Sequence, residues 1–339
     1  MSILKIPESL KSISIFNLIR MFTGMINQAP TKELKKRRGA IDCAQFFYCC
    51  DMPWRILGYR SFFSTMIATL RSLLIISKSA WYNDQEITER KGGIDLSRTI
   101  SLKNRVAIVT GASRGIGRSI VKSLADEGVH LALVARSLEK MKTLEQEIQT
   151  KRIKVRIFPV DIADPDVPEE VVKETIEEFG RLDFLINNAG IALSKPLIET
   201  TVEEWDRQMM VNARAPFLFS REAIPYLKKS DTPSIVNISS VVGYKGYVLQ
   251  GAYTASKHAL MGMTKVLAQE VHQDGIRVYV ISPGGVDTDL AWNMRPDLDR
   301  SILISPQEIT DLILYLLKHR GNAMIDEINV RRVTNQPWK

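Results

Sequence analysis

TGASRGIG, at residues 110–117, follows directly on an apolar run that starts at Arg105, and a helical pattern continues after it to about Ala125. A strand, a glycine-rich turn and a helix in this order are typical of a dinucleotide site. The glycines allow a sharp turn, and the free N–H groups at the helix end attract a pyrophosphate. Alone, such a turn is often only a tight turn, so the flanking strand and helix favour the binding interpretation.

Short apolar and β-branched runs alternate with helical stretches from about residue 100 onward. Such runs are typical of strands buried on both faces, and helical spacers imply right-handed crossovers and a parallel sheet. Residues 101–339 are therefore predicted to form one α/β domain, a doubly wound, Rossmann-type, mostly parallel sheet of seven strands. The predicted strands are residues 105–110, 131–136, 155–160, 182–187, 234–239, 276–282 and 328–333.

Arg136 stands at the end of the second predicted strand, where an acidic residue would bind the ribose hydroxyls of NAD. A guanidinium suits a doubly charged 2′-phosphate instead, and Arg114 in the glycine turn would add a second positive charge. We therefore expect NADP(H) as the cofactor. The alternative is that Arg136 is merely a solvated residue at a strand end.

Tyr253 and Lys257 lie four residues apart at the start of a helical stretch that reaches about Val271. This spacing places both side chains on one helical face. A phenol with an ordinary pKa near 10 is a poor acid or base at neutral pH, and a neighbouring ammonium would lower that pKa toward the working range. By itself the pair is usually only a helix surface, so its meaning depends on the other motifs.

Taken together, the motifs closely resemble the short-chain dehydrogenase/reductase family over residues 101–335. TGASRGIG matches that family's TGxxxGxG turn, and Ser240 lies thirteen residues before Tyr253, where the family has its catalytic serine. The segment Asn187-Asn188-Ala189-Gly190 matches the NNAG segment, although it would also suit a strand-ending turn in another fold. Pro283-Gly284 with Thr288 matches the loop on the nicotinamide side.

The resemblance implies a role for each matching residue. Tyr253 would donate the proton in reduction, Lys257 would lower its pKa and hold the nicotinamide ribose, and Ser240 would position the substrate oxygen. Asn212 would anchor a water that links Lys257 to solvent. The cofactor would contact Gly111, Ser113, Arg114, Gly115, Ile116, Gly117, Arg136, Asp161, Asn188, Tyr253, Lys257, Pro283 and Thr288.

Two neighbours compete for these roles. Ser239 is an alternative to Ser240, although the spacing to Tyr253 favours Ser240. His258 follows Lys257 directly, but consecutive helical positions point in different directions, so His258 is expected to be structural.

The first hundred residues differ from the rest of the chain. They hold 15 Lys and Arg against 8 Asp and Glu, whereas residues 101–339 hold 31 against 30. The main domain therefore lacks the basic surface that nucleic-acid binding needs, and we expect no nucleic-acid partner. All three cysteines, Cys43, Cys49 and Cys50, fall in the extension without a zinc-site spacing, so we expect no metal site; a reducing, cytoplasmic compartment is compatible with the cysteine-free domain.

Three interpretations of residues 1–100 stay open: a segment that is disordered or follows a wrongly chosen start, an amphipathic targeting or membrane-surface segment, and a small partner-binding module. The apolar run at residues 62–76 contains Arg71 and is too short for a membrane span, which needs about 20 residues. Residues 1–30 lack the compact apolar centre of a secretory signal.

The sequence thus predicts an NADP(H)-dependent oxidoreductase that reduces a ketone or 3-oxoacyl carbonyl, or oxidises the matching alcohol. A non-catalytic NADP-binding regulator or scaffold is the alternative. The chain lacks the glycine-rich tail of tetrameric members, so the resemblance favours a homodimer through residues 205–227 and 253–271. The segment between Thr288 and Ser305, where family members with large substrates often carry a longer lid, is short and therefore predicts an open pocket. Its mostly apolar walls are predicted to include Leu193, Tyr244, Tyr247, Leu249, Leu290 and Trp292.

Overall fold

The computed structural model describes residues 99–295 and 297–337. The predictions about the basic extension and its three cysteines fall almost wholly on residues 1–98, outside the described residues, and stay predictions.

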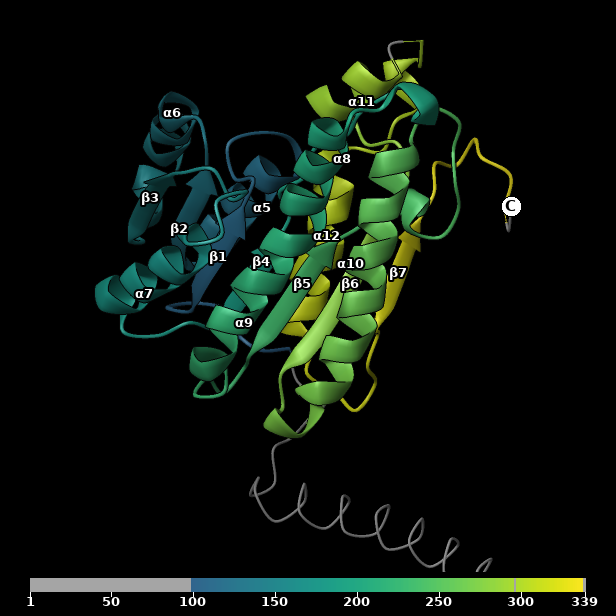
Figure 1. Ribbon diagram of the computed structural model, residues 1–339. Helices are drawn as coiled ribbons and strands as arrows, with labels where there is room; N and C mark the ends of the chain where they lie inside the picture. The colour runs from purple at the N-terminus through teal and green to yellow at the C-terminus, as the bar shows by residue number, and fades with distance from the viewer. Residues whose placement is uncertain (1–98, 296, 338–339) are drawn as a thin grey trace, which may run out of the picture. The chain divides into compact units, whose positions relative to one another are not determined.

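A seven-stranded sheet forms the centre of the described domain (Figure 1). Every neighbouring pair of strands is parallel, and the spatial order is β3-β2-β1-β4-β5-β6-β7. The predicted doubly wound fold is confirmed, with strand ends that differ from the prediction by a few residues. The strands are β1 Val106–Thr110, β2 His130–Ala135, β3 Val155–Pro159, β4 Phe184–Asn187, β5 Ser234–Ile238, β6 Arg277–Pro283 and β7 Glu327–Val330.

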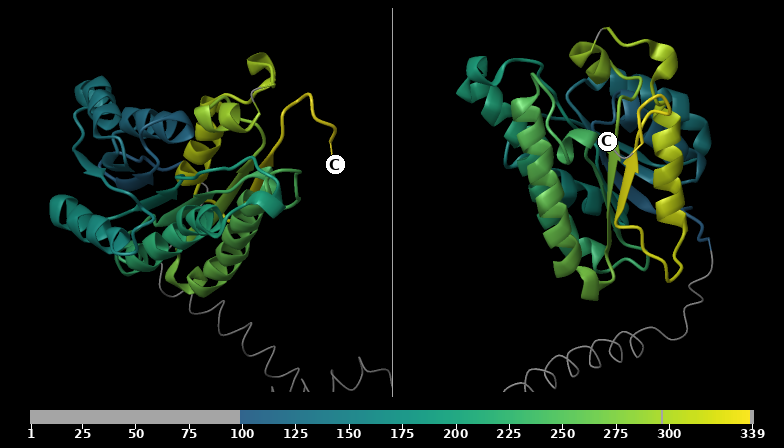
Figure 2. Two further views of the ribbon diagram at one scale, coloured as in Figure 1. Left: turned by 45° about the horizontal axis from the view of Figure 1, so that its top comes forward. Right: turned by 90° about the vertical axis from the view of Figure 1, so that its right-hand side faces the viewer.

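Helices cover both faces of this sheet. Figure 2 shows α10 and α12 on opposite sides of it. The buried residues divide accordingly: one apolar cluster joins the sheet to α5, α6 and α12, and the other joins it to α7, α9 and α10. No helix within the described residues is long and apolar enough to cross a membrane. The helices are α5 Gly115–Asp126, α6 Leu138–Ile148, α7 Val167–Phe179, α8 Val202–Met209, α9 Ala215–Leu227, α10 Gly251–Glu270, α11 Asp289–Met294 and α12 Pro306–Lys318.

The strand β1 illustrates why these runs form a central sheet. Ala107 and Val109 pack in the cluster with α5, whereas Val106 and Ile108 pack in the cluster with α7. Because successive side chains of a strand point to opposite faces, a strand covered on both sides must be apolar at every position. Each fully buried Val or Ile contributes about 1.5–3 kcal/mol through the area it removes from water.

The carboxyl ends of β1 and β4 mark the point where the strand order reverses, because β2 lies on one side of β1 and β4 on the other. Connections that leave in opposite directions open a crevice at such a point. Thr110 ties the two strand ends together. Its Oγ1 accepts from the backbone N–H groups of Asn188 (3.1 Å) and Ala189 (3.0 Å), and Asn188 Nδ2 donates to the Thr110 carbonyl (2.9 Å).

Candidate active site

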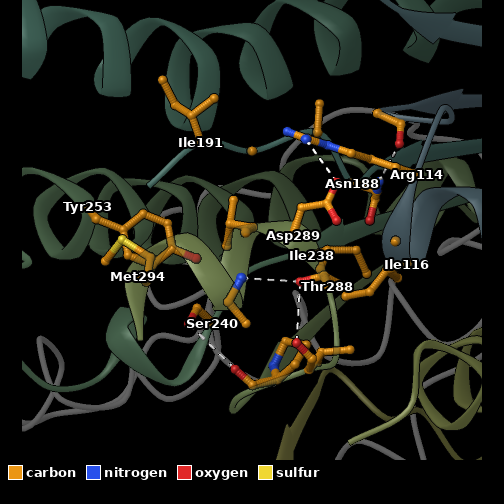
Figure 3. A pocket seen from close by; sticks show the side chains of 18 of the residues that line it. Arg114, Ile116, Asn188, Ile191, Ile238, Ser240, Tyr253, Thr288, Asp289 and Met294 are labelled. Atoms are coloured by element: carbon orange, nitrogen blue, oxygen red, sulfur yellow. Dashed lines mark hydrogen bonds and ion pairs between the residues drawn. The ribbon is translucent and has the colours of Figure 1, made fainter. Parts of the chain in front are cut away.

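A pocket of about 660 Å³ lies along this edge of the sheet. Residues from the loops after the first six strands line it, together with α11 and the chain that follows β7. Figure 3 shows side chains that are far apart in the sequence, such as Arg114 and Asp289, meeting in it. The parallel topology therefore gathers the predicted site residues at one edge.

The glycine turn after β1 is shaped by a close backbone approach. Gly111 and Gly115 have positive φ angles of 67° and 54°, which favour glycine. A Cβ at Gly117 would lie 2.1 Å from the carbonyl oxygen of Gly111, so only glycine fits there. The turn leads into α5, whose first turn carries no acidic residue. Its free N–H groups at the pocket edge fit an anionic pyrophosphate.

Three charged residues lie at the end of the pocket nearest β2 and β3. Arg136 is exposed and makes no hydrogen bond with any described residue. Asp161 is paired with Arg207 of α8. Burial opposes the charge of Asp161, but hydrogen bonds from the Ala163 N–H and Arg207 outweigh it and lower the pKa of the carboxyl. Arg136 thus has no hydrogen-bond partner among the described residues, and its charge adds to the lowering of the Asp161 pKa.

Arg114, predicted as a second charge for a phosphate, pairs with an acid instead. Its Nη1 lies 3.2 Å from Asp289 Oδ2, an ion pair that links the glycine turn to α11 (Figure 3). Both side chains are about half exposed, and an exposed pair of this kind contributes at most about 1 kcal/mol. A stronger anion in the pocket would therefore compete for Arg114 at small cost.

The end of the pocket that holds Tyr253 and Lys257 is buried. Tyr253 and Lys257 are 8% and 3% exposed, and Lys257 Nζ lies 6.0 Å from the centre of the Tyr253 ring. Burial raises the pKa of the Tyr253 phenol, against a smaller opposing effect of its hydrogen bond with Ser240. The predicted lowering of this pKa is therefore wrong for this arrangement, because the cost of burying a phenolate outweighs any nearby charge.

Lys257 is buried and has a backbone carbonyl as its hydrogen-bond partner. Its Nζ donates to the backbone oxygen of Ile238 at 2.9 Å. Burial lowers the pKa of the ammonium to about 8. Lys257 is thus close to the point where a small change in its surroundings changes its charge.

Asn212 lies in a short π-helix, Met210–Arg214, between α8 and α9. Its amide closes two hydrogen bonds with the backbone of Ile191, at 2.9 Å from the N–H and 2.8 Å to the oxygen, and also donates to Ser256 Oγ at 2.9 Å. Gly190 lies between Asn212 and Lys257: a Cβ there would be 3.4 Å from Asn212 Oδ1 and 3.6 Å from Lys257 Nζ. Asn212 thereby braces the loop after β4 against α10.

Sequence comparison agrees with this geometry. The family model for short chain dehydrogenases matches residues 105–299. The chain belongs to the short-chain dehydrogenase family. An oxidoreductase of Staphylococcus saprophyticus is 34% identical over 239 residues, which cover 69% of this chain and 100% of that protein.

Solved members of the short-chain dehydrogenase family share the fold. An alcohol dehydrogenase from Thermococcus sibiricus, complexed with 5-hydroxy-NADP, has a TM-score of 0.64 and 28% identity, covering 69% of this chain and 99% of its own. A metagenomic short-chain oxidoreductase in complex with NADP has a TM-score of 0.61 and 33% identity over 69% and 100%. A short chain dehydrogenase from Mycobacterium paratuberculosis bound to NAD has a TM-score of 0.62 and 26% identity, covering 68% of this chain and 97% of its own.

Most of the family-type residues predicted from sequence come together in this pocket. Gly117 and Asn212 do not line it: Gly117 packs under the turn, and Asn212 acts on the loop behind. Ser239 and Ser240 both line the pocket, but Ser240 is the one that bonds the phenol. His258 is exposed and bonds the Thr254 carbonyl, away from the pocket. The predicted residues that line it are Gly111, Ser113, Arg114, Gly115, Ile116, Arg136, Asp161, Asn188, Ser240, Tyr253, Lys257, Pro283 and Thr288.

The predicted walls are only partly right. Tyr247 and Leu290 line the pocket, whereas Leu193, Tyr244, Leu249 and Trp292 do not. Tyr244 turns instead toward Glu327 and Ser282, and its burial together with the Glu327 contact raises its pKa to about 12. Trp292 donates its indole N–H to Asp287 Oδ1 at 3.1 Å. The Tyr244 phenol and the Trp292 indole N–H thus bond to residues that do not line the pocket.

Several lining residues of this family member were missed. They include Arg207, Met294, Leu298, Arg332 and Asn335. Leu298 and the two residues after β7 reach the pocket only because chain segments fold back over it. No local pattern in the sequence signals such a return, so only tertiary structure reveals them.

Proposed function

We propose that this short-chain dehydrogenase is an NADP(H)-dependent enzyme that reduces a ketone or 3-oxoacyl carbonyl, or oxidises the corresponding alcohol. One observation carries the proposal: a buried tyrosine phenol, hydrogen-bonded to Ser240 and next to Lys257, lies in the same pocket as the glycine turn and Arg136. A pocket that only bound a nucleotide would have no use for this buried polar group.

The pocket residues fit a nicotinamide dinucleotide phosphate. The close packing at Gly111 and Gly117 leaves no room for side chains at these two positions, and the start of α5 offers N–H groups for a pyrophosphate. The free guanidinium of Arg136 suits a 2′-phosphate. Solved relatives in complex with NADP support this choice, although one similar structure carries NAD.

The bound nicotinamide would supply hydride chemistry, and the chain's own residues supply placement and the proton. Because burial raises its pKa, Tyr253 keeps its proton at neutral pH and acts as the acid toward a carbonyl oxygen. Ser240 orients that oxygen beside the phenol. Lys257, once turned from the Ile238 carbonyl, would stabilise the phenolate left after proton transfer, since an adjacent ammonium favours the charged form.

Asn212 would act behind this pair by fixing the loop that carries Gly190. Its three hydrogen bonds hold that loop against α10, and both Asn212 and Lys257 reach Gly190. A bridging water between Asn212 and Lys257 would return a proton from solvent. This relay is a proposal that rests on their common neighbour.

A turnover screen tests the proposal. NADPH oxidation is followed at neutral pH with a panel of neutral ketones and 3-oxoacyl thioesters, for the wild type and for Tyr253→Phe. We expect turnover with at least one carbonyl and a loss of about 10²–10⁴ in kcat for the variant. Equal turnover in both proteins would remove the role of the phenol, and NADPH binding without any turnover would favour the scaffold alternative.

We also propose a homodimer through α9 and α10. A groove between these helices is lined by Phe217, Ile224, Met263 and Val266. Phe217 and Val266 are 46% and 53% exposed, which is much apolar surface for one face. Light scattering should give a dimer, and Val266→Glu should shift it toward monomer. A monomeric wild type would contradict the proposal.

The catalytic unit is proposed to comprise residues 101–339 alone. A shortened chain that begins at Ile94 should keep full NADPH oxidation and solubility. If the basic extension instead holds the protein at a membrane surface, the full chain but not the shortened one should sediment with anionic vesicles. Loss of activity on shortening would place part of the extension in the catalytic unit.

A further inference from the structure

The chain after β7 folds back over the loop that follows β6. The Gly284 N–H donates to the Val330 carbonyl at 2.7 Å, and a Cβ on Gly285 would lie 3.7 Å from Arg332 Cδ and 3.8 Å from its Nε. Pro283, at the start of the same loop, accepts a hydrogen bond from Ser240 Oγ at 3.5 Å. The Arg332 side chain thus lies against the loop that also contacts the proposed catalytic serine.

Two neighbouring arginines in this tail have different roles. Arg331 Nη1 donates to the carbonyls of Arg332 (3.2 Å) and Asn335 (2.8 Å), and the Asn335 N–H donates to the Arg332 carbonyl at 3.0 Å. These bonds fold the tail into a turn around the Arg331 side chain. Arg332 and Asn335 are left facing the pocket, which both residues line.

The Arg332 guanidinium has no partner among the described residues. Its Nε and Nη1 atoms are buried and make no hydrogen bond. Three other arginines that line the pocket are paired, Arg114 with Asp289, Arg207 with Asp161 and Arg295 with Asp297. Leaving a buried charged donor unsatisfied is costly, so a polar partner is expected to enter the pocket there.

Arg332 and Arg136, the residue proposed to bind the 2′-phosphate, follow strands far apart in the sheet. Arg136 follows β2 and the glycine turn follows β1, whereas Arg332 follows β7. In the strand order, β7 is five steps from β2 and four from β1. Arg332 lies against Gly285, in the loop that begins at Pro283, whose carbonyl accepts the hydrogen bond from Ser240. Arg332 therefore lies at the substrate end of the pocket.

We infer that the substrate carries an oxyanion, a carboxylate or a phosphate, which Arg332 binds while the carbonyl lies at Ser240 and Tyr253. A guanidinium offers parallel N–H donors that match both oxyanions, and Asn335 adds an amide on the same side. The inference rests on the proposed carbonyl reductase function and narrows its substrate class from ketones in general to anionic ones.

Matched substrates test the inference. kcat/KM with NADPH is measured for 5-oxohexanoate against its methyl ester, and for the phosphate monoester of 4-hydroxy-2-butanone against the free alcohol. A charge-assisted hydrogen bond predicts a preference of roughly 10- to 100-fold for the anionic member of one pair. The pair in which it occurs identifies the oxyanion as carboxylate or phosphate.

Variants locate the preference. Arg332→Gln should abolish the preference for the anionic substrate, while turnover of the neutral partner and the KM for NADPH stay within about twofold. Arg332→Lys should keep part of the preference, because an ammonium keeps the charge but lacks the paired N–H donors of a guanidinium. Arg152→Gln, which removes an exposed charge ahead of β3, should leave it unchanged. Thermal melting verifies that each variant is folded.

The outcomes separate the two proposals. Turnover of neutral ketones with no anion preference, a preference that survives Arg332→Gln, or a parallel rise in the KM for NADPH would each overturn the inference and leave the reductase function standing. A wild type that reduces no carbonyl of either kind would overturn both.

Discussion

The two ends of the pocket hold their charged groups under opposite conditions. At the end nearest the glycine turn and β2, Arg136 is exposed and the Arg114–Asp289 pair is about half exposed. At the other end, Tyr253 and Lys257 are nearly inaccessible, and burial shifts the pKa values of both. Exposed charges are screened by water and salt, whereas buried ones are not. Substitutions at the first end should therefore change cofactor affinity, and at the second the chemistry and the stability.

The largest effect is expected at the buried end. Lys257→Met should lower kcat by about 10²–10⁴, because the phenolate left by Tyr253 loses its neighbouring cation. The assay is NADPH oxidation with a ketone found in the screen. Lys265→Met, on an exposed position of the same helix, is the control and should stay within about twofold. Comparable losses in both variants would show that the helix, rather than the buried charge, is being disturbed.

The same substitution should stabilise the fold. With a folded-state pKa of about 8 against an ordinary value of 10.5, Lys257 binds fewer protons in the folded state between these pH values. Wild-type stability should therefore rise with pH over that window, and the full penalty, up to about 3 kcal/mol, applies below pH 8. Urea unfolding should find Lys257→Met more stable at pH 7 by up to this amount, with the difference shrinking by pH 9.5. A less stable variant at pH 7 would contradict the buried-charge explanation.

At the exposed end, Arg136→Asp should reverse the cofactor preference. Loss of a charge-assisted contact to the 2′-phosphate predicts a fall of roughly 10- to 100-fold in the kcat/KM ratio for NADPH over NADH. The wild-type ratio should also decline as salt is raised. Arg152→Asp is the matched control with no expected change. An unchanged ratio in Arg136→Asp would leave this arginine as a solvated strand end.

The smallest effect concerns the ion pair over the glycine turn. Asp289→Asn frees Arg114 and removes a negative charge from the pocket edge, so the KM for NADPH should fall by about two- to threefold at low salt. The change should vanish at 0.5 M salt, where charges are screened within about 4–5 Å. A KM that rises instead would mean that Asp289 positions the cofactor.

The sequence predicted those parts of the site that short local motifs form. The glycine turn, Arg136 at a strand end, and Tyr253 four residues before Lys257 are all local patterns with a physical meaning. The last strand was placed at residues 328–333 but ends at Val330, because Arg331 and Arg332 leave the sheet for the tail and the pocket. The residue pattern at 328–333 does not show where the chain leaves the sheet, so it could not predict that the strand ends at Val330.

Two features of the site could not be predicted from the sequence. The direction of the Tyr253 pKa depends on burial by residues far along the chain, and the sequence suggested only the neighbouring ammonium. In the sequence, Arg332 looks like any exposed charged residue. Its position in the pocket follows from the bond between Gly284 and Val330, two residues 46 apart in the sequence. Long-range packing decided both cases.

The π-helix at Met210–Arg214 gives the chain a constraint on length in addition to one on residue type. It holds one residue more per turn than the α-helices that flank it, and each residue of an α-helix rotates the chain by about 100°. Deleting one residue there would not give a regular α-helix, because Pro216, at the start of α9, has no backbone N–H for the helix ladder. The deletion would rotate Asn212 relative to Ile191 and Ser256, so the three hydrogen bonds of Asn212 depend on the number of residues between α8 and α9.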